Sequence, residues 1–431
     1  MRLKFFSLFV CFSIVCFSSA FPNDVAKDDL IRKLSEKVDQ LEKKVDALSG
    51  KLGIYENSKG VSEEVIDKKV SDALARKAQD EPGFLKALKG ITLSGYVDAA
   101  YEYNFNTPSS GANTARIFDT EANSFTFQSA KIALEKLPSV EDRVGFRTDV
   151  IFGQDAKIIK SYGWDTDDVN LEQGYVDALL PLGKGLDVKF GKFVTLAGAE
   201  VIESKDNWNF SRGLLFGYAI PFTHTGIRAS YPVLDNLTGY FGINNGWDDI
   251  KDNNSSKTIE TALAYAPTDK VSFNLAYLFG PEYEDNNHSN RNLIDFIATY
   301  KPLEKLTFKV NTDYGFEDGL NGVYGVTGKD SGDWFGVAGY VRYDVNNWLS
   351  FSNRTEYFSD PDGLRNVGGL STALGQDVWE NTLTMELRPF KNIITRLEYR
   401  YDQSSENIFT KNDAEAAGHQ STIGFETIYA F

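Results

Sequence analysis

One repeated pattern constrains this chain more than any other. From residue 91 to the last residue, apolar and polar side chains alternate in segments of strand length. The segment 306–314 is the clearest, because Leu306, Phe308 and Val310 alternate with Thr307 and Lys309. Successive side chains of a β-strand point to opposite faces, so each such segment has one apolar and one polar face. The pattern predicts an all-β fold.

The connections between these segments alternate between short and long. The short turns place Pro, Asp or Asn between apolar or aromatic strand ends, at 137–139, 180–183, 231–237, 265–273, 300–308, 343–351 and 388–392. Between them lie long connections rich in Gly, Asn, Asp and Ser, such as 245–257, 280–292, 315–333, 358–377 and 404–420. Short turns on one side and long loops on the other are typical of a transmembrane antiparallel β-barrel of the outer membrane. Seven short turns and eight loops predict sixteen strands over residues 91–431.

The first twenty residues are predicted to be a signal peptide. Arg2 and Lys4 precede an apolar stretch, and small residues follow it up to Ala20. Both cysteines, Cys11 and Cys16, lie inside this segment, so we expect the mature chain to form no disulfide. A lipid anchor on Cys16 is the alternative. No run of 18 apolar residues follows residue 20, so no transmembrane helix is predicted.

Residues 21–56 are predicted to form a coiled-coil stalk in the periplasm. Apolar residues repeat at heptad spacing, with the a and d positions held by Ile31, Leu34, Val38, Leu41, Val45, Leu48, Leu52 and Tyr55. A single amphipathic helix lying on the barrel is the alternative. Residues 57–90 contain Gly60 and Pro82 and are interpreted as a helical linker.

Charge and composition limit the possible partners and chemistry. A net charge of −16 argues against nucleic acid as a partner. No Cys/His cluster or EF-hand spacing suggests a metal, and nothing points to a cofactor. Only His224, His288 and His419 are present as candidate bases, and His224 is expected to be an ordinary wall residue. We therefore expect no enzymatic activity.

A barrel of sixteen strands leaves an aqueous channel, so the charges that line it carry the chemistry. Ten residues of polar parity are assigned to the pore lining: Arg143, Arg147, Asp149, Lys309, Asp313, Arg354, Glu356, Arg396, Glu398 and Arg400. The two signs nearly balance, which favours weak ion selectivity. Alternatively, neighbouring pairs such as Arg354 and Glu356 only neutralise each other.

The connection at 194–220 is the longest and the least loop-like, because it contains many apolar residues, including Trp208, Phe210 and Leu214. Such residues are costly to leave in water, so we expect the segment to fold into the channel. The charged residues at the predicted constriction are Glu200, Glu203, Lys205, Asp206 and Arg212. An outward cap or a subunit contact is the alternative.

The chain ends on an alternating strand whose aromatic residues include Phe425, Tyr429 and Phe431. A terminal aromatic residue on a membrane strand indicates the signal that the barrel-assembly machinery recognises. These three residues are the predicted assembly signal.

The stretches 117–125, 144–147, 191–193, 199–212 and 224–228 resemble the OmpL-like β-barrel porins, and the similarity covers about residues 91–431. This resemblance implies an outer-membrane porin that lets small hydrophilic solutes and ions diffuse passively. It also implies contact with outer-membrane lipids and lipopolysaccharide and a homo-oligomer, with a trimer favoured. The chain is more distantly similar to phosphate-selective porins of the OprP kind, but the dense lysine ladder of those proteins is missing. A structural tether that contacts peptidoglycan through the stalk, and a surface adhesin acting through the loops, are the alternatives.

Overall fold

The computed structural model describes residues 90–164, 167–320, 330–367 and 375–431. The predicted signal peptide, the coiled-coil stalk and residues 57–89 of the linker lie outside the described residues. Residues 90–431 form one compact unit.

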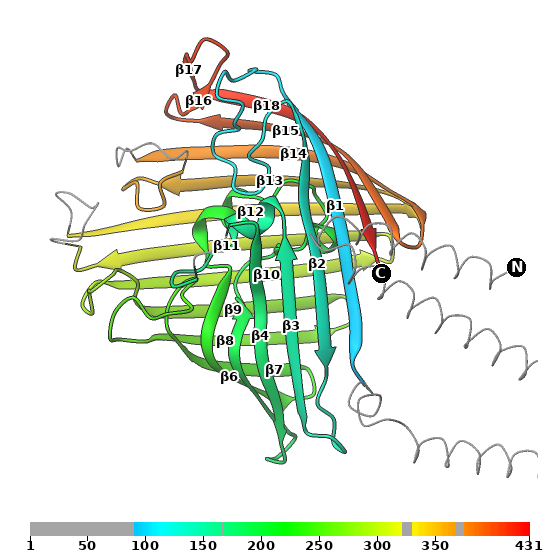
Figure 1. Ribbon diagram of the computed structural model, residues 1–431, viewed down its shortest axis with the longest axis vertical. Helices are drawn as coiled ribbons and strands as arrows, with labels where there is room; N and C mark the ends of the chain where they lie inside the picture. Colours follow the sequence, from blue (N-terminus) through cyan, green and yellow to red (C-terminus); the bar gives the residue numbers. More distant parts are fainter. Residues whose placement is uncertain (1–89, 165–166, 321–329, 368–374) are drawn as a thin grey trace, which may run out of the picture. The chain divides into compact units, whose positions relative to one another are not determined.

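Sixteen antiparallel strands close into a barrel, as the count of turns and loops predicted (Figure 1). Strand β1 pairs with both β2 and β18, which closes the sheet. The barrel strands are β1 (Thr92–Asn104), β2 (Ser124–Lys136), β3 (Val144–Phe152), β4 (Val169–Leu180), β5 (Leu186–Val194), β6 (Thr223–Leu234), β7 (Leu237–Asn244), β8 (Thr258–Thr268), β9 (Val271–Pro281), β10 (Asn290–Leu303), β11 (Leu306–Asp318), β12 (Ser331–Asn346), β13 (Leu349–Asp360), β14 (Gln376–Phe390), β15 (Ile393–Ser404) and β18 (His419–Ala430).

Short turns join the strands at one end of the barrel and long loops join them at the other. We call these the short-turn end and the long-loop end. Several short turns contain only two residues, such as 235–236 between β6 and β7 and 304–305 between β10 and β11. The strands run further than the sequence indicated: β11 and β12 shorten the predicted loop 315–333 to residues 319–330.

The long connections contain the remaining elements. These are the short helix α5 (Gln154–Ile158), the 3₁₀ turn η2 (Ser204–Asp206), the π-helical turn η3 (Leu215–Ala219) and a small hairpin of β16 (Phe409–Thr410) and β17 (Ala416–Ala417). Within the described ranges, no helix is long and apolar enough to cross a membrane.

The alternation along each strand separates an apolar outer wall from a polar inner wall. On β11, Phe308, Val310 and Tyr314 are each about 40% exposed on the outside, whereas Asn311 and Asp313 face inward and are 1% exposed. On the outer wall, the ring of Phe273 stacks on Tyr265 at 6.4 Å and on Phe296 at 6.2 Å. An apolar outer wall with aromatic bands is what a lipid bilayer requires of a barrel.

Candidate channel interior

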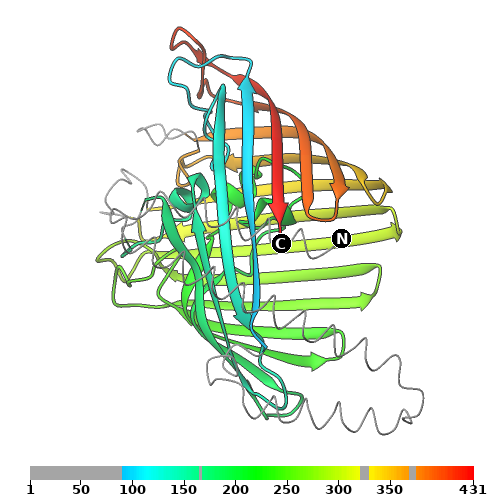
Figure 2. The same ribbon diagram turned by 45° about the vertical axis from the view of Figure 1, so that its right-hand side comes forward.

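The connection between β5 and β6 enters the interior of the barrel. In both Figure 1 and Figure 2 its green trace lies among the strands. We call residues 195–222 the inner loop. Its residues bond to inward-facing side chains on the far wall, more than 100 positions away in sequence. The structure therefore places this apolar segment against the inner wall.

The first part of the inner loop is bonded to β11 and β13. The Lys309 ammonium donates to the carbonyl oxygen of Ala199 at 2.9 Å, and the Ala199 N–H donates to Asn311 Oδ1 at 2.9 Å. Glu200 follows directly and forms a salt bridge of 2.7 Å with Arg354. Two neighbouring residues of the loop are thus held by three polar bonds to the wall.

The middle of the inner loop is bonded to Arg396 of β15. This guanidinium donates to the carbonyl oxygens of Ser204 at 2.9 Å and Asn207 at 2.6 Å. The same side chain forms salt bridges with Glu386 at 2.9 Å and Glu426 at 2.8 Å. Charge-assisted bonds of this kind contribute about 1.5–3 kcal/mol each, so they hold the loop backbone firmly.

The next residues are bonded to β15 again. Glu398 accepts the N–H groups of Phe210 at 2.7 Å and Ser211 at 2.9 Å. Arg400 donates to the carbonyl oxygen of Arg212 at 2.7 Å. The charges of the far wall therefore bind the backbone of the loop rather than facing open water.

One acidic cluster lies beside the inner loop. Side-chain oxygens of Asp149, Glu172 and Glu203 lie within 4.8 Å of one another, a spacing that could hold a metal ion. The Lys131 ammonium already lies among them, 2.8 Å from Asp149, 2.7 Å from Glu172 and in contact with Glu203. Burial alone would raise the pKa of Glu203, but the Lys131 charge outweighs it and lowers this pKa to about 2. The cluster already contains its cation.

The five predicted constriction residues have two different surroundings. Glu200, Glu203 and Arg212 are mostly buried and bonded, and the Arg212 guanidinium donates to the carbonyl oxygens of Phe210 and Ile202. The side chains of Lys205 and Asp206 are 31% and 53% exposed and bond to each other at 2.6 Å. Of these five residues, this pair presents most of the water-exposed charge.

The predicted pore-lining residues also divide into two groups. Arg143 lies just before β3 and donates to the Leu179 carbonyl, and the side chain of Arg147 is 27% exposed beside Asp149 and Glu135. The others face inward, but little water reaches them. Buried in this way are Asp149, Asp313, Arg354, Glu356, Arg396, Glu398 and Arg400, with Lys309 bonded to the inner loop.

Two further loops enter the interior, which the sequence analysis did not predict. In the loop between β1 and β2, Arg116 forms a salt bridge of 2.7 Å with Asp402. In the loop between β3 and β4, Asp155 lies 3.5 Å from Arg212, whose guanidinium stacks over the Phe118 ring at 4.6 Å. The sequence feature that could have indicated the inward path of the first of these loops is Phe118, an aromatic residue in a polar stretch.

Two of the three predicted assembly residues, Phe425 and Tyr429, lie on the outer face of β18, and Phe431 follows directly after this strand. Phe425, Tyr429 and Phe431 are 49%, 41% and 52% exposed. Phe431 also pairs with Gly95 of β1, since the N–H of each donates to the carbonyl of the other at 3.0 and 3.1 Å. The last residue therefore takes part in closing the barrel.

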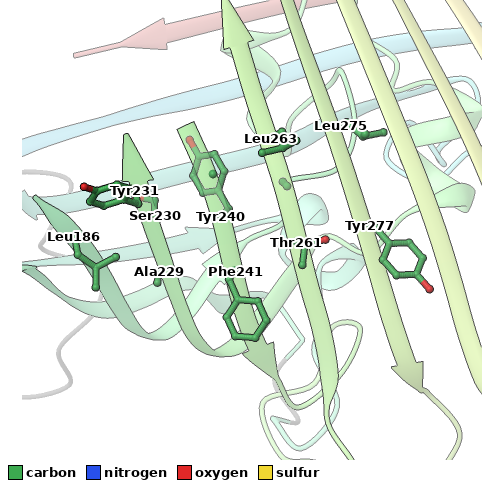
Figure 3. Close-up of a pocket in the computed structure, with 12 residues that line it drawn as sticks. Leu186, Ala229, Ser230, Tyr231, Tyr240, Phe241, Thr261, Leu263, Leu275 and Tyr277 are labelled. Carbon is green, nitrogen blue, oxygen red and sulfur yellow. The ribbon is translucent and has the colours of Figure 1, made fainter. Parts of the chain in front are cut away.

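A shallow apolar groove of about 450 Å³ lies on β6 to β9 (Figure 3). Phe241, Leu263 and Tyr277 line it, and their positions along the strands point outward. The groove belongs to the outer wall and has no part in the interior.

Comparison with known proteins agrees with this architecture. The sequence matches the family described as "Putative beta-barrel porin-2, OmpL-like" over residues 90–431. No significant match was found among curated proteins.

Solved structures of outer-membrane proteins share the fold at low identity. The anion-selective porin from Comamonas acidovorans is 12% identical with a TM-score of 0.56, covering 79% of this chain and 99% of its own. OprB of Pseudomonas putida is 11% identical with a TM-score of 0.52, covering 81% and 96%. OmpT of Vibrio cholerae in its trimer form is 12% identical with a TM-score of 0.52, covering 79% and 99%.

The barrel topology and the match over residues 90–431 lead to one conclusion. The chain belongs to the OmpL-like family of β-barrel porins and is an outer-membrane β-barrel.

Proposed function

We propose that the protein is a porin through which small hydrophilic solutes and ions diffuse passively, in a channel narrowed by residues 194–220. The observation that supports this is the set of bonds between the inner loop and Lys309, Arg354 and Arg396 on the far wall. A loop bonded to the opposite wall reduces the open cross-section of the barrel. Selectivity then depends on the charges left in water at that level.

Planar-bilayer recording of the purified mature protein tests this proposal. Stepwise single-channel currents in KCl are expected, and replacing residues 196–219 by a short Gly-Ser linker should raise the unit conductance. If neither protein carries current, the porin proposal fails.

The exposed pair on the inner loop allows a sharper test of the constriction. Asp206→Asn should shift the reversal potential in a KCl gradient towards anions, and Lys205→Gln should shift it towards cations. The cause is that low-dielectric walls focus the field of a charge at the narrowest point. Asp235→Asn is the matched control, because Asp235 also pairs with a lysine but lies fully exposed at a short turn. Equal shifts in all three variants would place the constriction elsewhere.

We further propose a homo-oligomer in the outer membrane, with a trimer favoured, surrounded by lipids and lipopolysaccharide and inserted by the barrel-assembly machinery. The fold shared with OmpT of V. cholerae, which is described in a trimer form, supports this proposal. Contact with peptidoglycan through the predicted stalk remains a prediction. Chemical crosslinking of the mature protein in outer membranes tests the oligomeric state.

A further inference from the structure

In the long-loop half of the barrel, every barrel strand has a buried side chain that faces the interior. Each strand has an inward-facing side chain there that is at most 4% exposed. In chain order these are Asn104, Gln128, Ile151, Asn170, Phe193, His224, Asn244, Thr258, Leu278, Leu293, Glu317, Trp334, Phe358, Val378, Asp402 and Gln420. The burial runs around the whole circumference, so it does not belong to one loop or one wall.

The short-turn half differs. Inward-facing side chains such as Arg147 of β3, Ser230 of β6, Asn274 of β9 and Thr299 of β10 are partly exposed. Water therefore reaches the interior from the short-turn end over this part of the wall. On β1, β15 and β18 the inward-facing Tyr96, Ile394 and Ile428 are buried near the same end, so the exposure covers only part of the circumference.

Apolar side chains make up the centre of the long-loop half. One buried cluster joins inward-facing wall residues, among them Leu293, Trp334 and Phe358, with loop residues such as Phe118 and Leu215. Its loop members come from several connections, including the first, second and third long loops. We call this cluster the apolar seal.

The aromatic rings of the seal are in direct contact. The Phe118 ring lies 5.9 Å from Phe216 and 5.5 Å from Phe222, and Trp247 meets Trp334 edge to face at 6.3 Å. Close-packed apolar groups offer water few hydrogen-bonding sites, and the polar groups at the edge of the seal include the guanidinium groups over the Phe118 and Trp334 rings. A hydrated ion would lose its shell without compensation in such a region, which is how hydrophobic constrictions block ion flow.

The inner loop consists of two parts that are held differently. Residues 199–212 are fixed by charge-assisted bonds to Arg354, Arg396 and Arg400. Residues 215–220 are held mainly by apolar packing, together with hydrogen bonds from Trp334 to the Ala219 carbonyl and from Arg365 to the Tyr218 carbonyl. The second part can leave without breaking the bonds to Arg354, Arg396 and Arg400, although it would give up the bond from the Arg365 guanidinium.

We infer that the apolar seal is a closed gate at the long-loop end, and that conduction requires residues 215–220 to move away from β12. This inference rests on the proposed porin function. It gives residues 215–220 a gating role that is separate from the role of the fixed residues 199–212.

A reversible crosslink between the inner loop and the wall tests the gate. A Cβ atom placed on Gly336 of β12 would lie 2.8 Å from Cγ of Leu215, the position that Sγ of a cysteine would take. The double variant Leu215→Cys with Gly336→Cys is therefore suited to form a disulfide. The other cysteines of the chain, Cys11 and Cys16, lie in the predicted signal peptide. We expect the oxidised mature protein to show at least tenfold less KCl current than the same protein after reduction.

Two controls accompany this experiment. The single variants Leu215→Cys and Gly336→Cys should not respond to oxidant. The pair Thr395→Cys with Thr427→Cys joins neighbouring strands on the outer wall, where the two hydroxyl oxygens lie 3.4 Å apart, and its disulfide should leave the current unchanged. Equal currents before and after reduction of the crosslinked 215–336 protein would overturn the gate.

Trp334→Ala provides a second readout if the cysteine pair does not fold. Removing this fully buried ring opens the centre of the seal, so the fraction of time in the conducting state should rise severalfold. An unchanged open fraction in folded Trp334→Ala protein would also overturn the gate. If no variant conducts in any condition, both the gate and the porin proposal fail.

Discussion

At the scale of single residues, two arginines bind the same carboxylate in different surroundings. Arg396 and Arg388 each have Nε 2.9 Å from Glu386, but the side chain of Arg396 is fully buried and that of Arg388 is 43% exposed. Arg396 also binds Glu426 and the backbone of the inner loop. Removing one member of a buried charge network leaves its partners unpaired in the low-dielectric interior. When an exposed partner is removed, water hydrates the charge that is left.

We predict that Arg396→Ala lowers the free energy of unfolding by about 3–5 kcal/mol. Arg388→Ala should lower it by at most about 1 kcal/mol, because exposed pairs contribute little. The measurement is the temperature at which the folded band disappears on an unboiled gel. Similar losses in the two variants would mean that the buried network does not hold the loop.

Two acidic side chains in neighbouring long loops give the protein a pH dependence. Asp249 and Glu282 flank Gly246, where an added Cβ would lie 2.8 and 2.9 Å from their oxygens. Burial raises the pKa of Glu282 to about 8. The positive charge of Arg291 opposes this increase, and the negative charge of Asp249 adds to it.

Burial raises the pKa of Asp249 to about 7, with a further increase from Asp248 and Asp252 and an opposing effect of Arg291. Thr258 and the Trp247 N–H donate to Glu282.

Because both pKa values are raised, the folded loops bind more protons than the unfolded chain between about pH 4 and pH 8. Their contribution to stability is therefore lost as the pH rises through this window. We predict that the melting temperature falls between pH 5.5 and pH 8.5, and that Glu282→Gln makes this fall smaller. An equal fall in both proteins would rule out Glu282 as its source.

At the scale of elements, β18 joins β1 to close the barrel, and Phe431, the residue after β18, adds a further backbone pair. Phe431 exchanges backbone hydrogen bonds with Gly95 and rests its ring at that glycine, since a Cβ on Gly95 would meet the ring at 2.7 Å. The terminal aromatic therefore has a structural role besides any recognition by the assembly machinery.

We predict that Phe431→Asp reduces the amount of folded protein in the outer membrane severalfold without changing synthesis. Phe390→Asp is the matched control, because Phe390 is 72% exposed at the short-turn end of β14, away from the closing pair. Quantitative blots of unboiled membrane samples give the comparison. Equal yields of the two variants would contradict a special role for the C-terminus.

At the scale of the whole molecule, the ladder from β1 to β18 has no free edge. A closed barrel satisfies its strand backbone groups internally, so detergent alone does not unravel it. We predict that the mature protein migrates differently on gels before and after boiling and shows a β-dominated circular dichroism spectrum. Identical migration together with a mainly helical spectrum would contradict a stable barrel in solution.

The sequence alone predicted the sixteen antiparallel strands and the alternation of apolar and polar faces along them. These features depend on local rules: a period of two, turn residues at strand ends, and alternating loop lengths. Strand ends were less certain, because pairing continues as long as a neighbour is present, as β11 and β12 show by pairing as far as Asp318 and Ser331.

Only the tertiary structure decided which charges meet. Arg354 binds Glu200 and Glu380 at 2.7 and 2.9 Å, while its sequence neighbour Glu356 accepts the Leu214 N–H. The inward paths of the loops that carry Arg116 and Asp155 were likewise not predictable from a periodic pattern. Such contacts join residues as far apart as Arg116 and Asp402, which are 286 positions apart, and no repeat along the chain records which distant group will lie beside a given charge.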